Sequence, residues 1–278
     1  VATELLFPRR HTVTSYCVGA LLSGGIFEVT VYARPRVLIV PTGSELVDWR
    51  TPAARELQPG QVLETNSYVL GSLVEAAGGV FVRHAIMADD PALIRQAVQE
   101  AIQGDFDMVL TVGGSSAGSE DYAKEVVSEL GHILVHGVTM MPGKPLLVGD
   151  VMGKPVFGIP GYPVSAIIAF EQFVRPLLRR HGGQADLVPQ TVAVETARKI
   201  PSKLGTEEFL RVKLGRVGDR IVAAPLPRGA GCITSITEAD GILRIPRNVE
   251  GLREGETIAA ELIRTPDAVD KTIMIVGS

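Results

Sequence analysis

The sequence predicts an α/β protein: a doubly wound, mostly parallel sheet followed by a small, barrel-like all-β domain. Between residues 36 and 183, short apolar runs alternate with stretches of helical spacing, which is typical of a parallel sheet covered on both faces. Between residues 184 and 264, short segments of alternating polarity are separated by turn residues, as in small barrels. With 278 residues and 46% hydrophobic content, the chain is long enough for two cores.

The α/β domain is expected over residues 36–183, after a lead-in of residues 1–35 that is the remnant of an upstream domain. Helices are placed where a capping residue precedes an amphipathic run; Asp90, for example, is a natural N-cap because Pro91 fits the first helical position. The expected elements are helix 14–24 and strand 26–33 in the lead-in, then strand 36–41, helix 66–77, strand 80–87, helix 91–103, strand 108–112, helix 121–130, strand 132–138, hairpin 145–160 and helix 163–180.

The small β domain is expected over residues 184–264, with strand-like segments at 190–200, 207–227, 241–246 and 256–263. Residues 265–278 read as a proline-marked linker followed by the first strand of a truncated further domain. The tail therefore predicts that the natural protein continues beyond these two domains.

Composition excludes several classes of function. A net charge of −4 without runs of like charge offers no basic surface for nucleic acid. Cys17 and Cys232 form no CxxC or Cys/His pattern, so neither a disulfide framework nor structural zinc is expected. The most apolar segments, such as 166–174, stop well short of the roughly 20 residues that a membrane helix needs. We therefore expect a cytoplasmic protein that binds neither nucleic acid nor a membrane.

Four loops follow strands at what would be one edge of the sheet: 42–46, 87–91, 113–121 and 161–165. Ligands of open α/β sheets bind outside the carboxyl ends of the strands, where glycines let backbone N–H groups approach an anion at a helix N-terminus. The alternative is a set of well-formed turns without a ligand. The candidate binding residues are Thr42, Gly43, Gly113, Gly114, Ser115, Ser116, Gly118, Gly161, Tyr162, Pro163 and Ser165.

The same loops carry acidic residues beside a lysine. Glu45, Asp89 or Asp90, and Asp121 are expected near Lys144, and acids beside anion-binding loops suggest a polyphosphate bridged by Mg²⁺. Simpler roles are an N-cap for Asp90, a solvated turn residue for Glu45 and a helix-dipole partner for Asp121. A merely solubilising role for Lys144 is less natural, because it lies between a glycine and a proline.

Several motifs, in order and spacing, resemble the molybdopterin-binding domain of molybdenum-cofactor biosynthesis proteins. They are "RVLIVPTGSEL", "ETNSY", "DDP", "GGSSAGSEDY", "MPGKP" and "GIPGYPVSA". Downstream, "EEFLRVKL", "APLP", "GAGCITSITEADGILRIP" and "GLREGETI" resemble the small C-terminal β-barrel domain of the molybdopterin molybdotransferases, the MoeA or gephyrin E class. The resemblance extends from Val13 to about Arg264.

This resemblance implies an activity and a site. It implies Mg²⁺-dependent insertion of molybdate into adenylylated molybdopterin (molybdopterin-AMP), with release of AMP; tungstate in place of molybdate stays open. Position by position, it implies Glu45, Asp121 and Lys144 as catalytic residues and Glu45, Asp89, Asp90 and Asp121 as metal ligands. It also adds Pro142, Gly143 and Ser235 to the substrate-binding residues.

The chain departs from its family at three places. Met141 stands where a lysine is common, and Tyr162 stands where an asparagine would cap a helix, so its ring is expected to lie over a flat pterin or to pack on a neighbouring loop. Little of the family's upstream region is present. The family implies a homodimer for the full-length protein, and we expect a weaker dimer or a monomer for this fragment.

Two alternatives remain from the sequence. One is the single-domain molybdopterin adenylyltransferase, which characteristically has "GGTG" and an Arg-Asp pair where this chain has Gly114-Ser115-Ser116 and Glu120-Asp121. The other is a non-catalytic, regulatory module that binds molybdopterin or an oxyanion, which Met141 and Tyr162 favour. The tail matches family members fused to a periplasmic-binding-protein-like domain, whose ligand the sequence does not identify.

Overall fold

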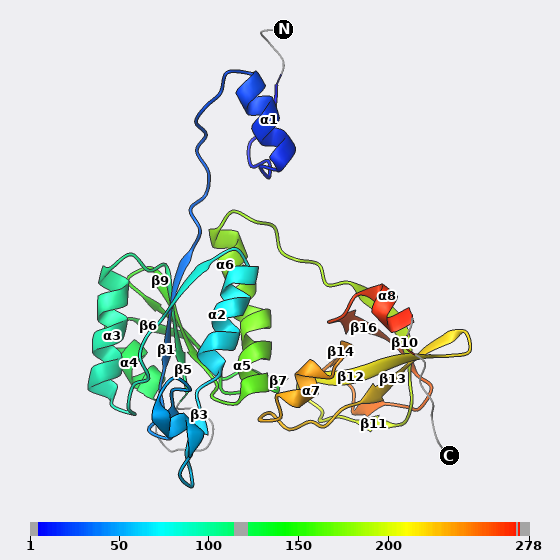
Figure 1. Cartoon of the computed structure of the whole chain (residues 1–278). Coiled ribbons are helices and arrows are strands. Elements are labelled where there is room, and N and C mark those ends of the chain that lie inside the picture. The colour runs from blue at the N-terminus through cyan, green and yellow to red at the C-terminus, as the bar shows by residue number, and fades with distance from the viewer. Residues whose placement is uncertain (1–4, 114–121, 271, 273–278) are drawn as a thin grey trace.

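The computed structural model describes residues 5–113, 122–270 and 272, and it contains the predicted doubly wound sheet (Figure 1). The sheet has six strands in the order β4-β1-β5-β9-β8-β6, of which β4, β1, β5 and β9 are parallel and β8 is antiparallel to both of its neighbours. The strands are β1 (Arg36–Pro41), β4 (Val80–Arg83), β5 (Met108–Val112), β6 (His132–His136), β8 (Leu147–Val151) and β9 (Lys154–Ile159).

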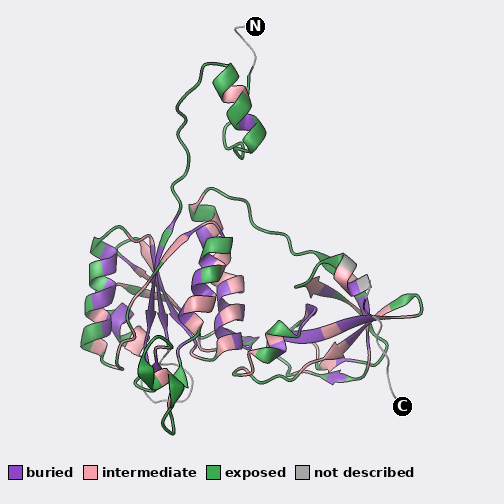
Figure 2. Cartoon of the chain, viewed as in Figure 1, coloured by how far each residue is buried: buried purple, intermediate pink, exposed green. Residues whose placement is uncertain are grey.

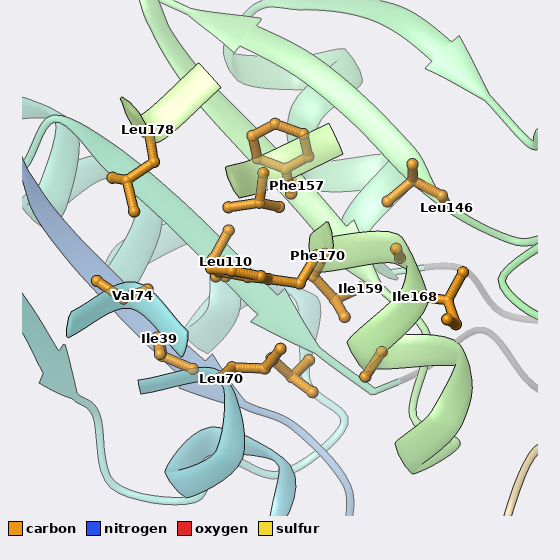
Figure 3. Packing of buried hydrophobic residues seen from close by; sticks show 14 of the residues in the cluster. Ile39, Leu70, Val74, Leu110, Leu146, Phe157, Ile159, Ile168, Phe170 and Leu178 are labelled. Carbon is orange, nitrogen blue, oxygen red and sulfur yellow. The ribbon is translucent and has the colours of Figure 1, made fainter. Parts of the chain in front are cut away.

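Helices cover both faces of this sheet, because alternate residues of the same strand enter different cores. Ile39, Leu110 and Ile159 face Leu70 and Phe170 of the helices on one side (Figure 3). On that side lie α2 (Asn66–Ala76), α5 (Pro163–Ala169) and α6 (Arg175–His181), and on the other lie α3 (Pro91–Gln103) and α4 (Tyr122–Leu130) (Figure 1).

The helix expected over 163–180 contains a π-helical turn, which its sequence pattern does not predict. Between α5 and α6, η2 (Phe170–Val174) is π-helical, and the N–H of Arg175 bonds to the carbonyl of Phe170. Pro176 explains the change, because it has no N–H to offer the carbonyl of Gln172 four residues earlier.

The second domain is a small all-β barrel, as predicted. It has five strands and is closed, because β13 pairs with both β12 and β10. Its core contains Leu210, Val212, Leu243 and Ala260. Its strands are β10 (Thr191–Thr196), β12 (Glu207–Val217), β13 (Arg220–Pro225), β14 (Gly241–Ile245) and β16 (Thr257–Leu262). Smaller elements are β11 (Ile200–Pro201), β15 (Gly251–Leu252), α7 (Thr234–Thr237) and α8 (Pro266–Asp270).

The two domains share a strand and a core. β7 (Met140–Met141) belongs to the chain of the α/β domain but pairs in parallel with β12 of the barrel, with Met140 opposite Glu207. Phe209 of β12 is buried in the same apolar cluster as Met140 and Phe170. The barrel is therefore attached by a hydrogen-bonded strand and by apolar packing as well as by the linking chain.

The lead-in extends away from the sheet (Figure 1). Its helix, α1 (Ser15–Ser23), ends at Gly24 as predicted, but the strand expected over 26–33 is extended chain without a ladder partner among the described residues. Most of this segment is exposed (Figure 2). An alternating apolar pattern favours a strand, but a strand forms a ladder only when a second strand lies beside it. No helix within the described part of the chain is long and apolar enough to span a membrane.

Candidate functional site

At Thr42 and Gly43, the end of β1 meets the end of β5 and the loop that follows β4. The N–H of Thr42 bonds to the carbonyl of Val112 at the end of β5 (2.8 Å), and the N–H of Gly43 bonds to the carbonyl of Met87 (3.0 Å). Thr42 is 5% exposed, so this junction lies beneath the surface. The first two of the predicted loops are therefore joined by backbone hydrogen bonds.

Gly113 and Gly161 bring the other two loops to the same place. Gly113 has a φ of 134°, and a Cβ atom there would lie 2.1 Å from the carbonyl oxygen of Thr42. A Cβ atom at Gly161 would lie 3.5 Å from the Cα of Gly113, and the side-chain amide of Asn66 donates to the carbonyl of Gly161 (2.7 Å). The strand-end loops thus converge with the start of α2.

The acidic residues of these loops have different surroundings. Asp90 caps α3 by accepting the N–H of Ala92 (2.8 Å), as predicted. Asp89 accepts the N–H of Ser44 (3.1 Å) with Oδ2, whereas its Oδ1 is buried and has no hydrogen-bond partner among the described residues. Glu45 is exposed, and its carboxylate lies 2.8 Å from the position that a Cβ of Gly43 would take.

The centre of the predicted site falls outside the described residues. Residues 5–113 and 122–270 contain no group of three or more His, Cys, Asp and Glu side chains arranged to hold a metal ion. The predicted residues that lie outside the described ranges are Gly114, Ser115, Ser116, Gly118 and Asp121.

The Lys144 loop packs against the start of α5. Gly143 has a φ of 108°, and a Cβ atom there would meet the side chain of Met140 at 2.3 Å and the carbonyl of Ser165 at 3.5 Å. Pro142 is buried beside it, whereas Lys144 is exposed. In the described part of the chain, the ammonium of Lys144 has neither a hydrogen bond nor an ion pair, so it is available to an anion.

Tyr162 occupies the N-cap position of α5 without capping it, and a loop of the barrel supplies the missing acceptor. The N–H of Val164 bonds to the carbonyl of Ala230 (3.0 Å), while Pro163 fills the first helical position. The ring of Tyr162 is 3.4 Å from the position of a Cβ built on Gly231. This contact corresponds to the packing alternative for Tyr162, although 46% of the residue stays exposed.

Ser235 lies behind this barrel loop. Its hydroxyl donates to the carbonyl of Cys232 (2.7 Å) and accepts from Arg211 Nε (3.2 Å), and the residue is 1% exposed. Arg211 also donates to the carbonyl of Pro227 (2.7 Å), and burial lowers the pKa of its guanidinium. In this arrangement Ser235 and Arg211 hold the loop that carries Ala230.

Sequence reasoning missed two residues that build the site. Glu64 is 2% exposed and caps α2 by accepting the N–H of Ser67 (2.8 Å), which leaves the amide of Asn66 free to reach Gly161. Both residues stand in the "ETNSY" motif, so the motif located them; their roles depend on partners that the sequence does not reveal. The carbonyl of Ala230 carried no sequence signal, because any residue offers one.

The family model described as "Probable molybdopterin binding domain" matches residues 38–180, which is the α/β domain with its converging loops. The chain belongs to the molybdopterin-binding domain family. A second model, "MoeA C-terminal region (domain IV)", matches residues 193–263 of the barrel. Together the matches identify a MoeA-like chain, as the motifs predicted.

Known MoeA-like proteins resemble this chain over most of its length. Molybdopterin molybdenumtransferase 2 of Mycobacterium tuberculosis is 35% identical over 250 residues, which cover 87% of this chain and 60% of that protein. The molybdopterin molybdenumtransferase of Nostoc sp. is 36% identical over 187 residues, which cover 66% of this chain and 42% of the relative.

A solved structure, the molybdopterin biosynthesis MoeA protein from Pyrococcus horikosii, is 32% identical with a TM-score of 0.76. The match covers 94% of this chain and 63% of that structure. The chain thus spans less than two thirds of the length of these relatives.

Proposed function

We propose that this chain is the core of a molybdopterin molybdotransferase, which inserts molybdate into adenylylated molybdopterin and releases AMP. The convergence of the ends of β1, β5 and β9 around Gly113 carries the proposal, because it creates a glycine-lined edge of the kind at which ligands of open α/β sheets bind. The curated relatives that bear the name molybdopterin molybdenumtransferase support the same reaction.

Lys144 and the start of α5 provide the positive end of the proposed site. Lys144 is an exposed cation without a partner in the described part of the chain, and it follows the loop that packs against Ser165. Its ammonium would hold the oxyanion, molybdate or phosphate, against the glycine loops. The barrel loop at Ala230 would cover one side of the ligand and limit the access of water.

The donor set fits a Mg²⁺ ion, which prefers carboxylate oxygens and keeps several waters. The partnerless Oδ1 of Asp89 and the exposed carboxylate of Glu45 flank Gly43-Ser44, and Asp121 would complete the set. When bound, the ion would neutralise the charge of the phosphate oxygens. Asp90 would contribute to the metal site only indirectly, by capping α3 beside it.

A second candidate is a binding module that keeps the pterin but does not turn it over. It is favoured by Met141, which is 40% exposed where the family commonly has a cation, and by Tyr162 at the α5 N-cap. This candidate predicts ligand binding without release of AMP.

Molybdate-dependent release of AMP from adenylylated molybdopterin distinguishes the two candidates. We expect release by the wild-type chain, a loss of about tenfold or more in Lys144→Ala, and no change in Lys199→Ala, an exposed lysine of the barrel domain. Asp121→Asn should weaken the Mg²⁺ dependence but leave pterin binding largely intact. Binding without release would favour the module, and equal loss of binding and metal response in Asp121→Asn would contradict the metal assignment.

We also propose that a protein of the relatives' full length is a homodimer and that this chain, which spans less than two thirds of that length, dimerises weakly or not at all. The support is the lead-in, which leaves Phe27 and Val31 80% and 65% exposed. Light scattering of this chain should give a monomer at nanomolar concentration; a persistent dimer would contradict the proposal, because the dimer contact would then lie within this chain.

A further inference from the structure

Trp49, the single tryptophan of the chain, is 57% exposed at the edge of the candidate site. It follows β2 (Leu46–Val47), which begins directly after Glu45 and pairs with β3 (Val62–Leu63). A tryptophan contributes more apolar area than other side chains, and leaving that area in water is unfavourable unless something binds to it.

The exposed ring packs against Tyr68, which in turn packs against Arg83. Trp49 meets Tyr68 edge to face with ring centroids 6.3 Å apart, and the guanidinium of Arg83 lies 4.9 Å from the centroid of the Tyr68 ring. Arg83 is in turn fixed by Glu64 (3.1 Å) and Asp48 (3.2 Å). The support under Trp49 is therefore built from buried or half-buried charge pairs.

The backbone on either side of Trp49 is also held. Arg50 bonds to Asp48 through its side chain (2.7 Å) and through its backbone N–H (3.0 Å). These hydrogen bonds lower the pKa of the Asp48 carboxyl, with a further contribution from the charge of Arg83. A ring whose neighbours are already fixed loses less conformational entropy when a ligand binds to it.

The stack is connected to the converging loops. Tyr68 is two residues beyond Asn66, whose amide bonds to the carbonyl of Gly161. The N–H of Val62 bonds to the carbonyl of Glu45 (3.0 Å), which ties the segment that carries Trp49 to the acidic loop. The hydroxyl of Tyr68 is buried without a hydrogen-bond partner among the described residues, which is uncommon for a buried polar group unless a ligand or water completes it.

We propose that Trp49, supported by Tyr68, is the stacking platform for a flat heteroaromatic ring of the substrate, either the adenine or the pterin. The inference rests on the proposed function and adds a residue that fixes the orientation of the ligand. A ring seated on Trp49 would leave the phosphate of the same molecule free to reach the glycine loops. Base stacking on an aromatic side chain tolerates either heterocycle, because both present a π-face.

Tryptophan fluorescence can follow the binding of a ligand at Trp49, because Trp49 is the only tryptophan in the sequence. We expect AMP or pterin-6-carboxylate, titrated separately into the full chain, to quench its fluorescence, and calorimetry to give the affinity. Trp49→Ala should weaken the binding of whichever ligand stacks on Trp49 by about tenfold, and Trp49→Phe should recover most of this lost affinity. Leu57→Ala, 40% exposed on the same loop, is the matched control and should bind like the wild type.

The two ligands separate the two sources of the ring. Weakened AMP binding in Trp49→Ala assigns the platform to adenine, and weakened pterin binding assigns it to the pterin. If the wild type binds either ligand and Trp49→Ala binds it equally well, the platform is wrong while the proposed function stands. If the folded wild type binds neither, the proposed function fails and the platform fails with it.

Discussion

The missing side chain at Gly113 lets two strand ends approach each other. The Cα atom of Gly113 lies so close to Thr42 that a methyl group on it would be 2.1 Å from the carbonyl oxygen of Thr42. The φ of Gly113, 134°, also disfavours any residue with a Cβ. At the scale of single residues, this contact sets the distance between the β1 and β5 loops.

Gly113→Ala should therefore lower the free energy of unfolding by about 3–5 kcal/mol, the sum of backbone strain and overpacking. Gly60→Ala is the control for strain alone, because Gly60 also has a positive φ (88°) but no atom lies within 4 Å of its Cβ position. Urea unfolding measures both variants. Equal losses in the two would show that the close approach to Thr42 contributes nothing.

Residues that act locally were predictable from the sequence, and residues that act over long separations were not. The Asp90 cap needs only Ala92, so a single-sequence pattern predicts it. The bond from Asn66 to Gly161 spans 95 residues, and that from Ser44 to Asp89 spans 45. Such partners emerge only from the packed fold.

At the scale of elements, α5 depends on the barrel for its start. The sequence predicted a lost cap at Tyr162, and the structure supplies the acceptor from Ala230 in the other domain. Pattern reasoning located this helix but missed its π turn, since a proline within a helical run indicates a disturbance without specifying its form.

Tyr162→Asn should lower the free energy of unfolding by about 1 kcal/mol, because the ring loses its packing against Gly231 while Val164 already has an acceptor. Tyr162→Phe keeps the ring and should be close to neutral. Thermal melts and pterin titrations of both variants check this. A more stable Tyr162→Asn variant would mean that the cap matters more than the packing, and a destabilised variant with unchanged affinity would exclude a stacking role for Tyr162.

At the scale of the whole molecule, Phe209 couples the domains. It belongs to the barrel strand β12 but is 2% exposed within the core of the α/β domain, and together with Val138 and Phe173 it lines an open surface pocket of about 530 Å³. The sequence predicted both domains and placed their boundary near residue 184. It did not predict β7, because a two-residue strand leaves no periodic pattern.

Phe209→Ala should lower the free energy of unfolding by about 3–5 kcal/mol. It should also cause the two domains to unfold at different denaturant concentrations. Trp49 fluorescence reports on the α/β domain, and hydrogen exchange of the β12 and β14 amides reports on the barrel. We expect the two midpoints in guanidinium to coincide in the wild type and to differ in the variant, while Phe209→Leu keeps most of the coupling. Coincident midpoints in Phe209→Ala would contradict a shared core.

The central claim is that this chain binds adenylylated molybdopterin at the edge of its sheet. Mass spectrometry of the small molecules released from the protein, purified from a cell that makes the molybdenum cofactor, tests it most directly. We expect a pterin that carries or accompanies AMP from the wild type, and a loss of that ligand from Lys144→Ala but not from Lys199→Ala. A folded wild-type protein that releases no pterin and no adenylate would contradict the account.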